Sequence, residues 1–289
     1  MNLITVRAFD EQLPQMQAVL RELVEIESPS TDKAALDRMG AKLTQLLRPL
    51  EPEIEIDAQP VAGDNIVARW PGSNGRVKDG FLILCHFDTV HPIGILAENP
   101  VRVQAGEIYG PGTIDMKASI VQVLFALQAL RAEQRWPQWP LTLLLTSDEE
   151  VGSEGARPLI ESLGRRAEVG LCMEPALPGG ALKTARKGVA NFEVVTRGQA
   201  AHSGANHRSG VNAIEEMAHQ VLALQALTDY EVGSTVSVGK ITGGTRSNVV
   251  PDEGRLIVDL RITTQAEAER MTALFEGLQA KLPGAQLHV

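Results

Sequence analysis

The sequence predicts an α/β protein of two unlike parts, residues 1–180 and 181–289. In the first part, helical patterns alternate with short, continuous apolar runs, which is typical of a mostly parallel sheet covered by helices. In the second part, strands of alternating polarity are separated by amphipathic helices. The stretch ALPGG, which favours neither helix nor strand, separates the two patterns.

In the first part, apolar residues spaced i, i+3, i+4 predict helices over 12–28 and 34–50. Three apolar runs, FLILC, LTLLLT and VGLCM, are predicted to be strands buried on both faces. The segment KASIVQVLFALQALRAEQ is predicted to be a crossover helix between the first two strands. Residues 63–80 are predicted to form a strand and a glycine-containing hairpin.

The second part is predicted to be a small α+β domain. Its strands are VANFEVVTRG, STVSVGKITGG, EGRLIVDLRIT and the final AQLHV, and its helices span 210–227 and 265–282. The resulting order, β-α-β-β-α-β, indicates a split-βαβ, ferredoxin-like domain with an antiparallel sheet.

Composition excludes several classes of function. The net charge is −9 without a basic cluster, so nucleic acid is not an expected partner. No apolar run approaches the length of a membrane-spanning helix, and the N-terminus lacks the layout of a signal peptide, which favours a cytoplasmic protein. Cys85 and Cys172 lie inside apolar runs, so we expect buried, reduced thiols.

The polar residues of interest stand where the predicted strands end. His86 follows FLILC, Glu149 and Glu150 follow LTLLLT, and Glu174 follows VGLCM, while Asp115 precedes the crossover helix. Ligands of open α/β sheets bind beyond the carboxyl ends of the strands. Taken singly, these residues fit a hydrogen-bonded histidine or a solvated loop. Their coincidence at strand ends favours a divalent-metal site.

The motifs HFDTV, GPGTIDMK, SDEEVGSEGA, MEP, AAHSG and GGTRSNVVP occur in this order along the chain. Together they resemble the M20 family of dinuclear zinc peptidases and deacylases, most closely the glutamate carboxypeptidase (carboxypeptidase G2) type. The resemblance implies a catalytic α/β domain with an inserted lid domain that dimerises, and therefore a homodimer. It also implies two divalent metal ions as cofactors, zinc in the first place and cobalt or manganese as alternatives.

The resemblance assigns roles to the residues at the strand ends. It implies that His86, Asp115, Glu150 and Glu174 are the metal ligands, with Asp115 bridging the two ions. Asp88, two residues after the histidine, would accept the other ring N–H of His86 and fix its tautomer. A cis peptide bond is expected after Asp115.

Further roles follow from the same resemblance. Glu149 would be the general base, which takes a proton from the attacking water and passes it to the leaving amine. His202 of AAHSG would reach across the dimer and help to hold the oxyanion. Asn248 and Arg261 of the lid would bind the terminal carboxylate of the substrate.

The implied function is a metal-dependent hydrolase that cleaves an amide or peptide bond next to a C-terminal amino acid with a free carboxylate. Its partner would be a small molecule or short peptide. One alternative is an N-acyl-amino-acid deacylase of the acetylornithine or succinyl-diaminopimelate type. Family aminopeptidases tend to carry Asp where this chain has Glu174, which argues against that activity. Another alternative is a metal-binding scaffold, against which the presence of Glu149 argues.

In M20 enzymes the chain returns from the lid to the catalytic domain and supplies a late histidine ligand. This sequence stops in the final predicted lid strand, at Leu287–Val289. We therefore expect that it is a fragment or an incomplete product without the C-terminal return. On that expectation it would hold the second metal weakly and hydrolyse poorly.

Overall fold

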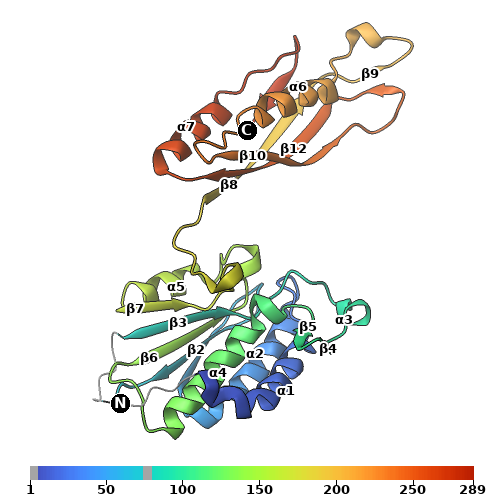
Figure 1. Cartoon of the computed structure of the whole chain (residues 1–289). Helices are drawn as coiled ribbons and strands as arrows, with labels where there is room; N and C mark the ends of the chain where they lie inside the picture. The colour runs from blue at the N-terminus through green and yellow to red at the C-terminus, as the bar shows by residue number, and fades with distance from the viewer. Residues whose placement is uncertain (1–5, 74–79) are drawn as a thin grey trace. The chain divides into compact units, whose positions relative to one another are not determined.

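The computed structural model describes residues 6–73 and 80–289. The chain divides into two compact units, Met1–Gly180 (unit 1) and Ala181–Val289 (unit 2), which are described separately (Figure 1). The hairpin expected near residues 74–79 lies outside the described residues.

Unit 1 is built on a mixed five-stranded sheet with the order β1-β2-β6-β3-β7. Strands β6, β3 and β7 run parallel, whereas β1 and β2 are antiparallel to their neighbours. The strands of this sheet are β1 (Glu53–Asp57), β2 (Asn65–Trp70), β3 (Phe81–His86), β6 (Leu141–Thr146) and β7 (Val169–Cys172). The α/β class predicted from the apolar runs is confirmed.

Helices cover this sheet on both faces. The main core joins apolar residues of α1, α2 and α4 to one face, and α5 packs in a smaller cluster on the other (Figure 1). The helices are α1 (Leu13–Val24), α2 (Lys33–Leu47), α3 (Ile95–Glu98), α4 (Ala118–Ala132) and α5 (Arg157–Gly164). Short 3-10 turns are η1 (Val6–Gln12), η2 (Arg48–Leu50), η4 (Glu149–Val151) and η5 (Pro178–Gly180). Apart from the main sheet, β4 (Arg102–Gln104) pairs with β5 (Glu107–Tyr109).

The crossover helix α4 lies between β3 and β6 in the chain, as predicted, and is apolar on most of its surface. With the preceding turn η3 (Thr113–Lys117), it forms one stretch, Thr113–Ala132, that is long and apolar enough to cross a membrane by length and composition. The expectation of no such run is corrected on this point. Half of the most apolar 18-residue part of this stretch is buried inside the protein. The core helix of a globular protein can have the same length and apolar composition.

Strand β7 departs from its prediction. It was expected to be buried on both faces, but all four of its residues are exposed. The thiol of Cys85 is buried as expected, whereas Cys172 is exposed. The physical reason is position: β7 is the edge strand and has β3 as its neighbour on one side. An apolar sequence alone does not distinguish an edge strand from a central one.

Unit 2 has a four-stranded antiparallel sheet with the order β10-β12-β8-β13 and two helices, which is the predicted split-βαβ arrangement. Its elements are β8 (Gly188–Arg197), α6 (Ala213–Gln225), β10 (Thr235–Gly243), β12 (Glu253–Ile262), α7 (Gln265–Glu276) and β13 (Gln286–His288). A small ribbon of β9 (Ala201–His202) and β11 (Val249–Val250), with a turn η6 (His207–Ser209), was not predicted.

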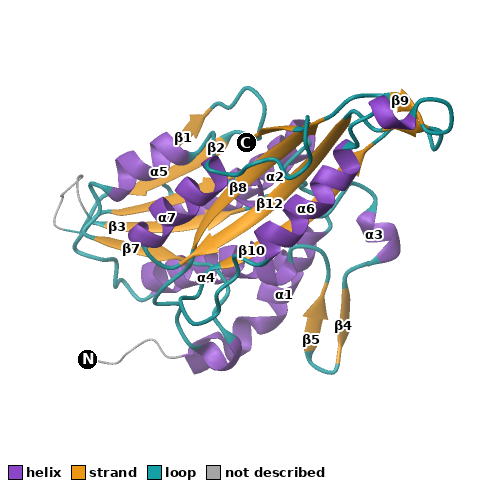
Figure 2. Cartoon of the chain, turned by 90° about the horizontal axis from the view of Figure 1, so that it is seen from above, coloured by secondary structure: helices purple, strands orange, loops and turns teal. Residues whose placement is uncertain are grey.

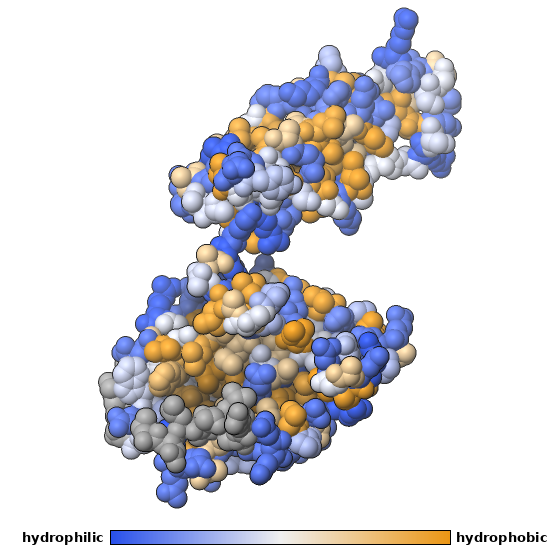
Figure 3. All heavy atoms as spheres, in the orientation of Figure 1, coloured by the Kyte–Doolittle hydropathy of each residue, from blue (hydrophilic) through white to orange (hydrophobic). Residues whose placement is uncertain are grey.

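Both helices of unit 2 pack on one face of its sheet (Figure 2). Along β12, buried and exposed residues alternate, so that Leu256, Val258 and Leu260 meet the helices and Ile257 faces the other way. Capping side chains set the helix starts: Asn212 accepts from two backbone N–H groups of α6, and Thr264 from one of α7. Hydrophobic residues also gather on the visible surface of each unit in Figure 3.

Candidate metal centre

His86 is the last residue of β3, and its ring is buried. In the parallel pairing with β6, His86 lies opposite Thr146, so both strands end at the same level. The ring is 2% exposed, and Nε2 lies 2.9 Å from an oxygen of Asp115 and 3.3 Å from an oxygen of Glu174. The other nitrogen, Nδ1, lies 3.3 Å from a carboxylate oxygen of Asp88. Nε2 is therefore the nitrogen that faces the acidic residues.

Asp88 connects the ends of the two strands. Its carboxylate is fully buried and accepts backbone N–H groups of both Glu149 and Glu150, each at 3.1 Å. The hydroxyl of Ser30 donates to the same carboxylate at 2.7 Å. Asp88 thus orients the His86 ring and also fixes the backbone that carries the two glutamates. Ser30 could not be predicted from sequence patterns, because this contact joins segments 58 residues apart.

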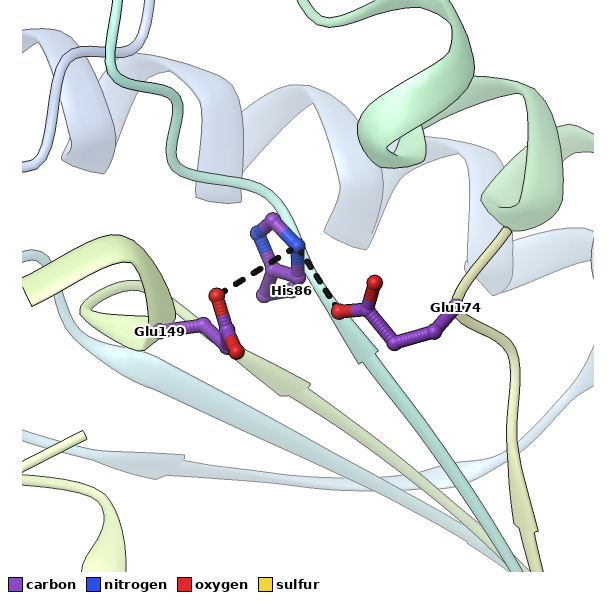
Figure 4. A group of neighbouring side chains, drawn as sticks. All are labelled: His86, Glu149 and Glu174. Carbon is purple, nitrogen blue, oxygen red and sulfur yellow. Dashed lines mark ion pairs between the residues drawn. The ribbon is translucent and has the colours of Figure 1, made fainter. Parts of the chain in front are cut away.

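The acidic side chains converge on Nε2 of His86 from separate elements. Figure 4 shows the carboxylates of Glu149 and Glu174 on two sides of the ring, and the oxygen of Glu149 lies 3.9 Å from Nε2. Two groups have ligand atoms close enough for a shared ion: His86 with Glu149 and Glu174, and His86 with Asp115 and Glu150. Every metal ligand expected from the sequence therefore lies in one cluster, together with the expected base.

The third acidic residue of the SDEE motif, Asp148, is separate from this cluster. It is 4% exposed, and one of its oxygens accepts the N–H groups of Gly155, at 2.7 Å, and Ala156. The carboxylate therefore secures the loop that leads into α5. The crowding of three acidic residues in the sequence is resolved by giving them different partners.

The electrostatics of the cluster favour a cation. Burial acts to lower the pKa of His86, but hydrogen bonds with Asp88 and Glu174, together with the charges of Asp88 and Glu149, outweigh it and raise the pKa to about 11. Burial raises the pKa of Glu149 and of Glu150, and neighbouring carboxylates add to this effect. Burial also acts to raise the pKa of Asp88, yet hydrogen bonds from His86 and Ser30 lower it below its ordinary value.

This donor set fits a divalent ion such as zinc. One imidazole nitrogen and several carboxylates are the ligand types that zinc takes, and their ligand atoms lie within 4.8 Å of one another in each group. Both groups depend on the single nitrogen Nε2 of His86, which can bind one ion. If His86 binds the ion of the first group, a second ion would keep Asp115 and Glu150 as the ligands that its group offers among the described residues.

The turn before α4 places Asp115 beside the histidine. Gly112 has φ of +68°, and a Cβ built on it would lie 2.5 Å from the side chain of Thr89, so that only glycine fits this turn. The peptide bond between Asp115 and Met116 is cis, which confirms the expectation. Lys117 follows as a buried amine that donates to the carbonyl of Ile26 at 2.9 Å, and burial lowers its pKa to about 7. No sequence pattern had indicated that Lys117 would be buried beside this turn.

The expected lid residue His202 lies in the β9–β11 ribbon of unit 2 and is exposed. Its Nδ1 accepts the backbone N–H groups of Gly204 and Ala205, both at 3.1 Å. A nitrogen that accepts carries no proton, so the neutral ring has its proton on Nε2. His202 is therefore oriented as a hydrogen-bond donor through Nε2.

The two residues expected to bind a substrate carboxylate lie at opposite ends of unit 2. The carbonyl of Asn248 accepts from Ser203, beside the ribbon. Arg261 pairs with Thr235, whereas Gly254, at the ribbon end, pairs with Gly243. The seven residue-to-residue steps from 254 to 261 span about 23 Å of strand. Within one chain, a single small carboxylate cannot contact both side chains.

Comparison with known proteins gives consistent results. Residues 184–284 match the family described as the peptidase dimerisation domain. The chain is 32% identical to carboxypeptidase G2 of Pseudomonas sp. (strain RS-16), over all of this chain and 70% of that protein. It is also 32% identical to the acetylornithine deacetylase of Myxococcus xanthus, over 94% of this chain and 73% of that protein. A dinuclear metal-binding M20 peptidase from Bacillus subtilis has the same fold, with a TM-score of 0.63, 19% identity, and coverage of 95% of this chain and 72% of that one.

Proposed function

The chain belongs to the M20 family of metallopeptidases, and on that premise we propose that it hydrolyses an amide or peptide bond beside a C-terminal amino acid with a free carboxylate. The substrate would be a small molecule or short peptide of the glutamate carboxypeptidase kind. The observation that carries this proposal is the convergence of His86, Asp115, Glu150 and Glu174 on one site with Glu149 beside them.

The proposed division of roles gives binding to some residues and proton transfer to another. His86, Asp115, Glu150 and Glu174 would hold two divalent ions, zinc in the first place. When bound, such ions polarise the scissile carbonyl and lower the pKa of water. Glu149 would accept the proton of the attacking water on its carboxylate and deliver it to the leaving amine. Its raised pKa suits this task, because a base works best with a pKa near the working pH.

Three lid residues would complete the site. His202 is proposed to donate its Nε2 hydrogen to the developing oxyanion, which its Nδ1 contacts support. Asn248 and Arg261 are each proposed to contact a substrate carboxylate. Within one chain they lie too far apart along the sheet to contact the same one. A homodimer formed through unit 2 is proposed from the match to the dimerisation domain.

A second candidate reaction is the removal of an acyl group from an amino acid. It is favoured by the acetylornithine deacetylase, which is as similar in identity as the carboxypeptidase. Both reactions attack an amide next to a free carboxylate, so the same cluster serves either.

The test is a comparison of substrates with zinc-loaded protein. We expect faster hydrolysis of N-acyl-glutamates than of N-acetyl-ornithine or succinyl-diaminopimelate. Faster turnover of the latter two would replace the carboxypeptidase proposal with the deacylase. The absence of hydrolysis of all three, with the metal bound, would contradict both.

A further inference from the structure

The segment that connects α1 to α2, residues 26–30 (IESPS), belongs to neither group of candidate metal ligands. It nevertheless runs alongside the residues that follow β3. The carbonyl of Ser28 accepts the N–H of Thr89 at 2.8 Å, and the N–H of Ser30 donates to the carbonyl of Thr89 at 3.2 Å. A parallel bridge also joins Pro29 to Thr89. The backbone of this connecting segment is therefore fixed beside the chain that carries the histidine ligand.

The connecting segment also contacts the turn that carries Asp115. The amine of Lys117, which is 2% exposed, donates to the carbonyl of Ile26 at 2.9 Å. The buried hydroxyl of Ser28 donates to the carbonyl of Phe87, just after β3, at 2.7 Å. One short segment is thus bonded to two of the parts of the chain that bring ligands to the centre.

The side chain of Ser30 completes a set of four donors around the buried carboxylate of Asp88. One oxygen, Oδ1, lies 3.3 Å from Nδ1 of His86 and accepts the N–H of Glu149 at 3.1 Å. The other, Oδ2, accepts the N–H of Glu150 at 3.1 Å and the hydroxyl of Ser30 at 2.7 Å. The contact with Ser30 is the shortest of the four, and Ser30 is the one donor of this set that is neither a candidate ligand nor the candidate base.

The Ser30 hydroxyl has a clear preference between its two nearby acceptors. The carboxylate of Asp88 lies at 2.7 Å, whereas the carbonyl of Thr89 lies at 3.4 Å. Hydrogen bonds to a charged acceptor are also stronger than those to a neutral one. The single hydroxyl proton is therefore directed at Asp88.

Loss of this hydroxyl would leave Oδ2 with one donor. The carboxylate of Asp88 is fully buried, so bulk water does not replace the missing partner directly. Rotation of the carboxylate would recover contacts for Oδ2 only by disturbing those of Oδ1. Those contacts hold the ring of His86 and the backbone of Glu149, and groups behind a ligand in this way set its orientation.

We propose that Ser30 is a positioning residue of the metal centre. Its hydroxyl fixes the carboxylate of Asp88, and through that carboxylate it fixes the ring of His86 and the turn that carries Glu149 and Glu150. The inference rests on the proposed function only for the statement that the centre hydrolyses a substrate.

The test measures cobalt(II) binding to the whole chain after removal of metal, because the visible absorption of cobalt reports the geometry of its ligands. Wild type is compared with Ser30→Ala, Ser30→Thr and Ser28→Ala. The threonine variant keeps the hydroxyl. Ser28→Ala is the matched control, since it removes a hydroxyl from the same segment with a hydrogen bond of the same length, 2.7 Å, but to a backbone carbonyl.

We expect Ser30→Ala to weaken cobalt binding by roughly 10- to 100-fold, the usual effect of removing a group behind a metal ligand, and to change the absorption spectrum. Ser30→Thr should restore the affinity and the spectrum of the wild type. Ser28→Ala should lower the urea midpoint of unfolding and keep both. With zinc, Ser30→Ala should reduce kcat by a similar factor and leave KM unchanged.

Three results would overturn the proposal. The first is a Ser30→Ala variant with the affinity and spectrum of the wild type. The second is an equal loss in Ser28→Ala, which would indicate a general loosening of the segment. The third is a loss in Ser30→Thr as large as that in Ser30→Ala, which would assign the effect to side-chain size. Ser30 is only partly buried, so its replacement leaves no core cavity, and circular dichroism verifies the fold of each variant.

These results are separable from the failure of the proposed function. Cobalt binding is measured without substrate, whereas the function is judged by hydrolysis with zinc. Cobalt binding that depends on Ser30, without any hydrolysis by the wild type, would contradict the function and support the positioning role. Hydrolysis by the wild type with cobalt binding independent of Ser30 would do the reverse.

Discussion

Glu149 and Glu150 are neighbours in the chain, but their carboxylates fall into different groups of candidate ligands. Glu149 joins Glu174 beside His86, whereas Glu150 joins Asp115. The backbone explains how adjacent residues serve two positions: both N–H groups are held by Asp88, and the side chains then leave the turn in different directions.

The proposed base can be tested by Glu149→Gln, which keeps the shape and removes the basic oxygen. We expect turnover to fall by about 100- to 10 000-fold, the usual contribution of a general base. The zinc content, measured by mass spectrometry, should stay close to that of the wild type. Glu154→Gln, an exposed neighbour in the same loop, is the control and should keep its activity. Loss of zinc together with turnover would make Glu149 a ligand.

Asp148 is expected to matter for stability. In Asp148→Ala, the N–H groups of Gly155 and Ala156 lose their acceptor, and at least one is buried. The free energy of unfolding should fall by about 1–3 kcal/mol, as for a buried donor left without a partner. Urea unfolding followed by circular dichroism measures this change. Unfolding at the same urea midpoint would show that solvent replaces the carboxylate.

At the scale of the element, a buried carboxylate ties α6 to the segment before β13. Glu216 is fully buried and accepts the backbone N–H groups of Lys281 and Leu282, together with the side chain of Gln220. Burial acts to raise the pKa of Glu216, but these hydrogen bonds outweigh it and lower the pKa below its ordinary value. The folded state therefore favours the charged form of this residue.

This arrangement predicts a dependence of stability on pH. Because the folded pKa of Glu216 lies below its ordinary value of 4.5, its contribution is complete above that pH and is lost as the pH falls through the folded value. We expect Glu216→Gln to lower the free energy of unfolding by about 1–3 kcal/mol at neutral pH. The difference from the wild type should shrink below pH 4.5. Denaturant unfolding at several pH values checks this, and a constant difference would contradict it.

At the scale of the whole molecule, the metal centre should bind its two ions unequally. Nε2 of His86 can serve one ion, and the second has two carboxylate ligands in its group apart from that nitrogen. Calorimetric titration of zinc into the metal-free chain should therefore show one tight and one weaker event. Ligands that bind the folded state also stabilise it, so the unfolding temperature should rise with zinc. Two equal, tight sites would require another ligand.

The sequence by itself determined the α/β class, the split-βαβ unit and the candidate site residues. These depend on short-range patterns: apolar runs predict strands, and the residues that end them share one edge of the sheet. His86 and Glu149 could be predicted for this reason, since each lies at or just beyond the end of a strand. The motifs then added the cis bond after Asp115, which no local propensity would indicate.

Only the tertiary structure decided the remaining questions. The exposure of Cys172 depends on the order of strands, and the contacts of Ser30 with Asp88 join segments distant in the chain. The pairing of Arg261 with Asp259 depends on which face of the sheet each side chain takes. Such properties arise from the packing of elements against one another, and this packing is a property of the whole fold that local sequence patterns do not carry.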